Sequence, residues 1–264
     1  MSFKNKIIWI TGASSGIGEA LAYALAKQEA TLILSSRKIE ALQKVQQRCL
    51  KDCKAIYVQV LDLEQHDQIP KIVQQVIHQH GRIDLLINNG GISQRSLAKD
   101  TIFEVDQRLM NINYLGTVAL TKALLPTFLK QQEGQIVTVT SLTGVLGTPY
   151  RSAYAATKHA LHGFFDSLRA ELVNDNITIT IISPGFIKTQ VSINAFVGNG
   201  TAQGSMDSRQ NEGMDVNVFA QKMLSAIAKK KKEVYIGKKE VLMAYIKRYI
   251  PWLYYQMIPR VKVK

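Results

Sequence analysis

The chain has 264 residues, of which 46% are hydrophobic and 20% charged, as expected of one globular domain with a full core. Its formal net charge of +13 comes mostly from Lys229–Lys264, which holds nine Lys and two Arg but only two Glu. The sequence has no recognisable nucleic-acid reader motif, no apolar run long enough to span a membrane and no leader-like segment before the first apolar stretch. We therefore do not expect a nucleic-acid-binding protein, a membrane-spanning protein or a protein with a secretory leader.

Cysteine and histidine give no pattern of a metal site. Cys49 and Cys53 are four residues apart in a predicted helix, and without a nearby His or Cys cluster we expect two reduced thiols. None of the histidines has ligand spacing with acidic support. We interpret all five as ordinary residues on helix surfaces: His66, His78, His80, His159 and His162.

The segment Ile7–Gly18 reads IIWITGASSGIG. The apolar run Ile7–Ile10 predicts a strand buried on both faces, and the three glycines that follow lead directly into a helix with apolar residues at helical spacing. Glycine lets a backbone approach a ligand closely, and the unpaired first N–H groups of a helix favour an anion such as a pyrophosphate. The spacing G-x-x-x-G-x-G alone also fits a plain tight connection.

Strands and helices alternate along the rest of the chain, which predicts successive βαβ units and a parallel, doubly wound sheet with helices on both faces. Helices are predicted from Ile17, then through about Leu50, and over Gln65–His80, Asn113–Lys130 and Ala153–Asn174. Seven strands are predicted in all. The six that follow Ile7–Ile10 are Thr31–Ser35, Ala55–Val60, Asp84–Ile87, Gln135–Thr140, Ile177–Ser183 and Val234–Ile236.

Polar residues and glycines follow the predicted strands where each one ends. Because the carboxyl ends of parallel strands meet at one edge of the sheet, these residues should line one crevice. They are Gly12, Arg37, Asp62, Asn89, Ser141 and Pro184.

Tyr154 and Lys158 are one helical turn apart, so the phenol and the ammonium share a helix face. A phenol with a pKa near 10 is a poor acid or base at neutral pH, and an adjacent cation favours its ionised form. Such a pair also arises by chance on a helix surface. Its meaning depends on the other motifs.

Together the motifs resemble those of the short-chain dehydrogenase/reductase family over about residues 5–190. The resemblance implies a Rossmann fold and hydride transfer between a nicotinamide and a carbonyl or alcohol. Gly90 departs from it, because the family usually has Ala there. The matching motifs are TGASSGIG at Thr11–Gly18, NNGG at Asn88–Gly91, Asn113 in NINYLG, Ser141, Tyr154-x-x-x-Lys158 and Pro184-Gly185.

The resemblance also implies catalytic roles. Tyr154 would protonate the carbonyl oxygen in reduction and act as the base in reverse, while Lys158 would lower its pKa and bind the nicotinamide ribose. Ser141 would hold the substrate oxygen, and Asn113 would anchor a water that relays protons. Since all four positions are filled, we expect an active enzyme. The alternatives are a nucleotide-binding sensor or scaffold without turnover, and an NAD-dependent alcohol dehydrogenase.

The end of the second predicted strand reads Ser35-Ser36-Arg37-Lys38. A carboxylate there would bind a ribose 2′-OH, whereas Arg37 and Lys38 suit a 2′-phosphate. We therefore predict NADP(H), the alternative being that Arg37 merely begins a helix in solvent. The candidate cofactor-binding residues are Gly12, Ser14, Ser15, Gly16, Ile17, Gly18, Arg37, Lys38, Asp62, Leu63, Asn89, Tyr154, Lys158, Pro184, Gly185, Ile187 and Thr189.

Residues 190–213 form a long segment with few core-forming residues, which is typical of a lid. Its apolar members hint at an apolar carbonyl or alcohol substrate, such as a lipid-derived ketone, a steroid or a 3-oxoacyl group. They are Val191, Ile193, Phe196, Val197 and Met206. We place this lid within a Rossmann-type domain covering residues 1–237, with residues 238–264 as a basic, aromatic C-terminal extension of the same domain.

The extension mixes aromatic and cationic residues. This mixture suits the headgroup layer of an anionic membrane, while packing on its own domain or on a partner subunit is the alternative. We expect a cytoplasmic protein, peripheral on the inner face of the membrane if the tail binds lipid, and the family resemblance implies a homodimer or homotetramer. The residues concerned are Tyr245, Tyr249, Trp252, Tyr254 and Tyr255, flanked by Lys238, Lys239, Arg260, Lys262 and Lys264.

Overall fold

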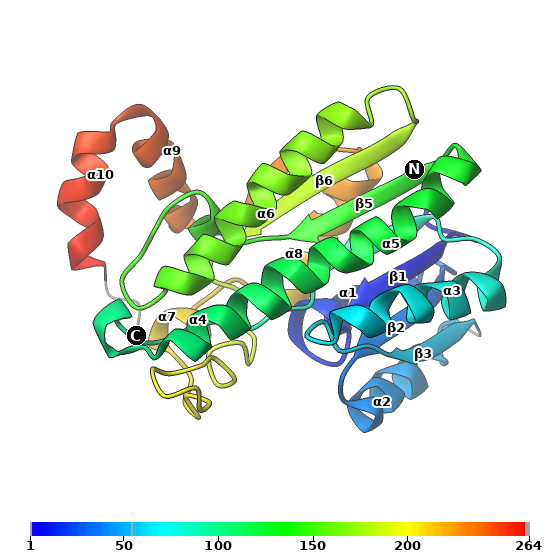
Figure 1. Cartoon of the computed structure of the whole chain (residues 1–264), viewed down its shortest axis with the longest axis horizontal. Helices are drawn as coiled ribbons and strands as arrows, with labels where there is room; N and C mark the ends of the chain where they lie inside the picture. The colour runs from blue at the N-terminus through cyan, green and yellow to red at the C-terminus, as the bar shows by residue number, and fades with distance from the viewer. Residues whose placement is uncertain (1, 54, 262–264) are drawn as a thin grey trace.

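The computed structural model describes residues 2–53 and 55–261. Its centre is a seven-stranded parallel sheet in the order β3-β2-β1-β4-β5-β6-β7 (Figure 1). The strands are β1 (Ile7–Thr11), β2 (Thr31–Ser36), β3 (Ile56–Val60), β4 (Leu85–Asn88), β5 (Gly134–Val139), β6 (Ile177–Pro184) and β7 (Glu233–Ile236).

Helices cover both faces of this sheet, which confirms the predicted doubly wound α/β fold. One apolar core joins α1, α2 and α8 to the sheet, and a second core joins α3, α5 and α6 to its other face. The helices are α1 (Gly16–Ala26), α2 (Ile39–Cys49), α3 (Ile69–His80), α4 (Phe103–Leu109), α5 (Gly116–Gln131), α6 (Ser152–Glu171), α7 (Ser208–Asn211), α8 (Val216–Ala228), α9 (Leu242–Tyr249) and α10 (Pro251–Met257).

The strand order reverses at β1, which pairs with β2 on one side and with β4 on the other. Chains leaving β1 and β4 therefore turn to opposite faces of the sheet, and a crevice opens between them. Thr11 joins the two strand ends, because its Oγ1 accepts hydrogen bonds from the backbone N–H of Asn89 (3.0 Å) and of Gly90 (2.9 Å). These hydrogen bonds hold the ends of β1 and β4 together at the bottom of the crevice.

The helix predicted over Asn113–Lys130 is in fact part of a longer helical run. α4 precedes it, and a π-helical turn over Met110–Leu115 joins α4 to α5. A π turn takes more residues per turn than an α-helix, so the apolar period shifts there and the two segments do not look continuous in sequence. Asn113 lies within this turn.

The C-terminal extension packs on its own domain. Pro251 begins α10 and separates it from α9, and the two helices form the outlying pair at the left of Figure 1. Tyr254 is buried, and its hydroxyl donates a 2.5 Å hydrogen bond to the carbonyl of Gly147, while Lys247 Nζ donates to the carbonyl of Val145. Lys262 and Lys264 lie outside the described residues.

Among the described residues, none of the helices has the length and apolar character needed to cross a membrane. Both cysteines are free thiols, as predicted. Burial raises the pKa of Cys49 to about 12, so this thiol stays protonated and packs as a small apolar side chain.

Candidate active site

The turn between β1 and α1 has room for a ligand only because it carries glycines. Gly12 and Gly16 have φ angles of +64° and +58°, in the left-handed region that other residues rarely adopt. At Gly18 an added Cβ would lie 2.3 Å from the carbonyl oxygen of Gly12, so glycine there lets α1 approach the turn. The open N-terminus of α1 thus faces the crevice.

This crevice is a cavity of about 630 Å³ at the carboxyl ends of the strands. Two of the predicted site residues, Gly18 and Asn113, do not line it. The other predicted site residues all do: Gly12, Ser14, Ser15, Gly16, Ile17, Arg37, Lys38, Asp62, Leu63, Asn89, Ser141, Tyr154, Lys158, Pro184, Gly185, Ile187 and Thr189.

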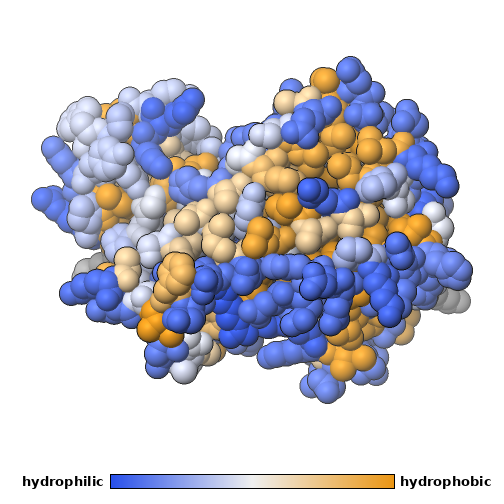
Figure 2. Space-filling view, in the orientation of Figure 1, coloured by the Kyte–Doolittle hydropathy of each residue, from blue (hydrophilic) through white to orange (hydrophobic). Residues whose placement is uncertain are grey.

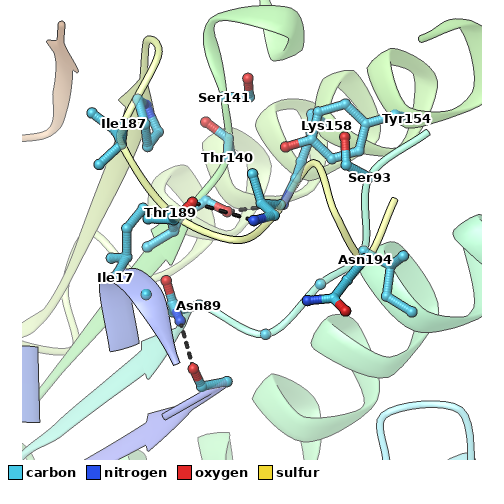
Figure 3. A pocket seen from close by; sticks show the side chains of 18 of the residues that line it. Ile17, Asn89, Ser93, Thr140, Ser141, Tyr154, Lys158, Ile187, Thr189 and Asn194 are labelled. Carbon is cyan, nitrogen blue, oxygen red and sulfur yellow. Dashed lines mark hydrogen bonds between the residues drawn. The ribbon is translucent and has the colours of Figure 1, made fainter. Parts of the chain in front are cut away.

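Tyr154 and Lys158 project from α6 into this cavity (Figure 3). The Lys158 ammonium lies 5.7 Å from the centre of the Tyr154 ring and donates a 3.0 Å hydrogen bond to the carbonyl of Val139. Burial lowers the pKa of Lys158 to about 8. Burial also raises the pKa of Tyr154, while Arg151, Arg95 and hydrogen bonding with Ser141 act in the opposite direction.

Ser141 follows β5 and faces the same space. Its Oγ accepts a 3.1 Å hydrogen bond from the backbone N–H of Thr143, which fixes the hydroxyl at the start of a short helical turn over Leu142–Gly144. The Ser141 hydroxyl also forms a hydrogen bond with Tyr154, so the two hydroxyl groups lie side by side in the cavity. The arrangement therefore brings together a phenol, an ammonium and a hydroxyl.

Asn113 holds together two backbone segments that border the site. Its side chain is fully buried, with Oδ1 accepting from Ile92 N–H and Nδ2 donating to the Ile92 carbonyl, both at 2.8 Å, and with a further 3.2 Å bond to Thr157. These bonds tie the segment after β4 to α6. Asn113 therefore positions the segment after β4 against α6, and its role in anchoring a relay water stays a prediction.

The other end of the cavity offers cations. Arg37 and Lys38 are exposed at the end of β2, and within the described part of the chain no carboxylate forms an ion pair with either side chain. Asp62 lines the same end, with its Oδ1 capping the N–H of Glu64 at 3.0 Å. The glycine cradle, the open helix N-terminus and these cations fit the phosphates and ribose of a nicotinamide dinucleotide.

Comparison with known proteins agrees with this geometry. A family model for short chain dehydrogenases matches residues 6–199. The chain belongs to the short-chain dehydrogenase family. It is 39% identical over 264 residues to a "Dehydrogenase/reductase SDR family protein 7-like" of Drosophila melanogaster, covering 98% of this chain and 81% of that protein. To the human "Dehydrogenase/reductase SDR family member 7" it is 40% identical over 251 residues, covering 93% and 74%.

Solved structures of other proteins share the fold. A short-chain dehydrogenase/reductase from Burkholderia phymatum in complex with NAD has a TM-score of 0.84 at 20% identity, with 96% of each chain covered. An alcohol dehydrogenase from Thermococcus sibiricus complexed with 5-hydroxy-NADP has a TM-score of 0.74 at 22% identity, with 89% of this chain and 97% of that chain covered. The protein is thus an oxidoreductase with a Rossmann site for a nicotinamide cofactor.

Other residues of this short-chain dehydrogenase line the site without having been predicted. Arg95 Nε and Asp207 Oδ2 form a buried ion pair at 2.5 Å, and Arg95 Nη1 donates to Ser93 Oγ at 2.6 Å. Nothing local in the sequence indicates this pair. Arg151 also lines the cavity, and its place three residues before Tyr154 puts both on one helix face, a signal that was available.

One histidine of this family member was assigned wrongly. His162 is not a surface residue, since its side chain is only 12% exposed. Its Nε2 lies 3.1 Å from Thr140 Oγ1 and 3.3 Å from Ser183 Oγ, and burial lowers its pKa. The face of α6 that bears it packs on the ends of β5 and β6. His162 therefore supports the strand ends beneath the site.

The segment over residues 190–213 lies over the cavity of this dehydrogenase. Val191, Asn194 and Phe196 line the cavity, and the ion pair of Asp207 with Arg95 anchors the far end of the segment. Of its other predicted apolar members, Ile193, Val197 and Met206 do not reach the cavity wall. The apolar surface that the segment offers a substrate is therefore smaller than its sequence suggests.

Proposed function

We propose that this protein is an NADPH-dependent reductase of ketones or aldehydes, and in reverse an alcohol dehydrogenase. The observation that carries the proposal is the convergence of Tyr154, Lys158 and Ser141 on the cavity that also contains the glycine turn. A bound nicotinamide cofactor supplies or accepts the hydride. All other steps belong to side chains of the protein.

Tyr154 is the proposed acid. Its hydroxyl gives a proton to the substrate oxygen as the carbonyl is reduced, and takes the proton back in oxidation. Ser141 donates a hydrogen bond to the same oxygen and holds the substrate in line. Lys158, whose ammonium lies 5.7 Å from the centre of the Tyr154 ring, is proposed to stabilise the charge left on the phenol and to position the ribose of the cofactor. Arg151 and Arg95 favour the ionised phenol in the same way.

NADPH is proposed over NADH because the end of β2 carries Arg37 and Lys38 and no acid. The guanidinium matches the 2′-phosphate in shape and charge. An Asp or Glu in this place would instead bind the two ribose hydroxyls and repel a phosphate.

The substrate side of the cavity is mostly apolar, which supports a lipid-, steroid- or 3-oxoacyl-like substrate. Its apolar walls come from Leu146, Phe186, Val191, Phe196 and Met243. Ordered placement of Tyr154, Lys158 and Ser141 argues against a sensor or scaffold without turnover, since such a role needs only the nucleotide cradle.

Reductase activity is tested by following NADPH oxidation at 340 nm with a panel of ketones of increasing apolar length. We expect at least one ketone to be reduced, with kcat/KM rising with chain length until the cavity is filled. Each buried CH₂ adds about 0.8 kcal/mol. Tight NADPH binding with no turnover across the panel and in the reverse direction would favour the sensor instead.

For the assembly, we propose a homo-oligomer formed through α5 and α6. Figure 2 shows an apolar band over these two helices in the orientation of Figure 1. Leu115, at the start of α5, is 42% exposed on the described chain. A contiguous apolar band on a helix face is typical of a surface that a second subunit covers.

We further propose that the C-terminal extension associates with an anionic membrane surface, which would place a cytoplasmic enzyme on the inner face of the membrane. Tyr249, Trp252 and Tyr255 are 77%, 64% and 65% exposed. In Figure 2 the lobe of α9 and α10 mixes pale side chains with blue ones. Aromatic rings beside Lys and Arg are suited to the headgroup layer.

Liposome flotation tests the membrane proposal on the full chain. We expect the parent protein to float with phosphatidylglycerol vesicles, and a Tyr249→Ser/Trp252→Ser/Tyr255→Ser variant to stay in the lower fraction. Val173→Ser, which removes an apolar side chain that is 75% exposed elsewhere, is the control and should float like the parent. Equal flotation of parent and triple variant would contradict the proposal and leave the aromatic face for a partner subunit.

A further inference from the structure

Arg151 is a buried cation whose donors are left unused. The residue is 7% exposed and lies at the N-terminal end of α6, where it lines the cavity. Its Nε and Nη2 have no hydrogen-bond partner among the described residues. Buried guanidinium groups nearly always have their N–H donors paired, because an unpaired donor away from water costs free energy. Two donors of Arg151 are therefore left unpaired by the described residues, at the wall of the cavity.

Among the described residues, the carboxylate that forms an ion pair with Arg151 is that of Asp207, which other groups already use. Asp207 accepts from Arg95 Nε through Oδ2 at 2.5 Å and from Gln203 Nε2 through Oδ1 at 2.8 Å. Arg151 Nη2 lies 4.0 Å from the same Oδ2, too far for a hydrogen bond. Two buried guanidinium groups thus share one carboxylate, and within residues 2–53 and 55–261 one positive charge has no carboxylate of its own.

The remaining neighbours of Arg151 cannot replace an anion. Its Cζ lies 5.6 Å from the centre of the Phe186 ring, a contact that attracts the cation but leaves the N–H donors unpaired. Burial lowers the pKa of Arg151 to about 9, so the group is still charged at neutral pH. Arg151 and Tyr154 also interact electrostatically, which places the cation near the proposed proton donor.

The cofactor phosphates are not the natural occupants of this position. The glycine turn and Arg37 serve them, and Ile17 of that turn lies on the opposite side of the cavity from Tyr154 in Figure 3. Arg151 precedes Tyr154 by less than one helical turn and therefore lies at the substrate end.

We propose that Arg151 binds an oxyanion, a carboxylate or a phosphate, carried by the substrate. That this substrate carries a carbonyl which is reduced rests on the proposed function. That Arg151 binds its anion rests on the cavity alone. With the apolar walls beside it, the site then selects amphiphilic substrates, in which an oxyanion fixes one point and an apolar chain fills the rest. An uncharged ketone of the same length would leave Arg151 buried and unpaired.

The anion site is tested without turnover, by isothermal titration calorimetry of the full chain with octanoate and with octanamide, in the absence and in the presence of NADPH. The two probes have the same length and differ in charge. We expect octanoate to bind at least about tenfold more tightly, as for a charge-assisted bidentate pair. Octyl phosphate, titrated in parallel, distinguishes a preference for phosphate from one for carboxylate.

Arg151→Gln should abolish the preference for octanoate and leave octanamide binding unchanged. Arg151→Lys keeps the charge but not the planar fork, so octanoate should bind severalfold less tightly yet still ahead of octanamide. This second variant carries the test if the Gln variant does not fold. Arg209→Gln removes an exposed cation on α7 and is the matched control, with the preference expected to remain.

The proposal is overturned if the parent protein binds octanoate and octanamide equally, or if the preference survives in Arg151→Gln. Equal weakening of both probes in Arg151→Gln would also overturn it, because a purely structural cation predicts that result. Weaker NADPH binding in that variant with the octanoate preference intact would assign Arg151 to the cofactor. Reduction of 7-oxooctanoate and of its methyl ester is measured separately, so that absence of turnover with intact octanoate binding counts against the proposed reaction alone.

Discussion

Replacing Tyr154 by Phe is expected to lower kcat for carbonyl reduction by about 10³-fold, within the usual range for a general acid. Phe keeps the ring, its packing and its contact with Lys158, but removes the hydroxyl that interacts with Ser141. Because no other part of the cofactor cradle changes, NADPH should bind with its parental Kd. Stopped-flow single turnover and fluorescence titration of NADPH measure the two effects on the same sample.

Tyr249→Phe is the matched control for Tyr154→Phe, since it removes a phenol that is 77% exposed and lies away from the cavity. Its kcat should equal that of the parent. If Tyr154→Phe reduced the same ketone at the parental rate, Tyr154 would not be the acid. A joint loss of activity and of NADPH binding would instead indicate a disturbed fold.

Replacing Arg37 by Ala is expected to remove most of the preference for NADPH. Hydrogen bonds to charged groups contribute about 1.5–3 kcal/mol, which corresponds to roughly ten- to hundredfold in Kd. The loss should appear in the Kd of NADPH alone, because NADH has no 2′-phosphate for Arg37 to contact. Titration of both cofactors with parent and variant measures the change.

Lys44→Ala is the control for Arg37→Ala, because it removes another exposed cation, on α2, without altering the lining of the cavity. It should leave both Kd values unchanged apart from a small salt-dependent effect. If the parent protein bound NADH as tightly as NADPH, the assignment of Arg37 would be wrong. The enzyme would then be better described as an NAD-dependent alcohol dehydrogenase.

Most of the fold and of the cofactor cradle follows from local sequence. The strand predicted over Ile7–Ile10 forms as β1 (Ile7–Thr11), and the glycine turn leads into α1 as predicted, because apolar period and glycine conformation act within a few residues. The strand ends are equally local, since a parallel sheet brings residues such as Asn89 and Ser141 to one edge wherever they stand in the chain. Tyr154 and Lys158 share a helix face because they are four residues apart on one helix, which is also a local property of the sequence.

The tertiary structure decided what depends on distant partners. Arg95 and Asp207 are 112 residues apart, and no periodicity reports such a pair. His162 lies against the strand ends because α6 packs on them, and Asn113 lies in a π turn from which its side chain pairs with the backbone of Ile92. Whether a buried charge such as Arg151 has a partner is a property of the assembled interior, because desolvation and pairing arise there and not along the chain.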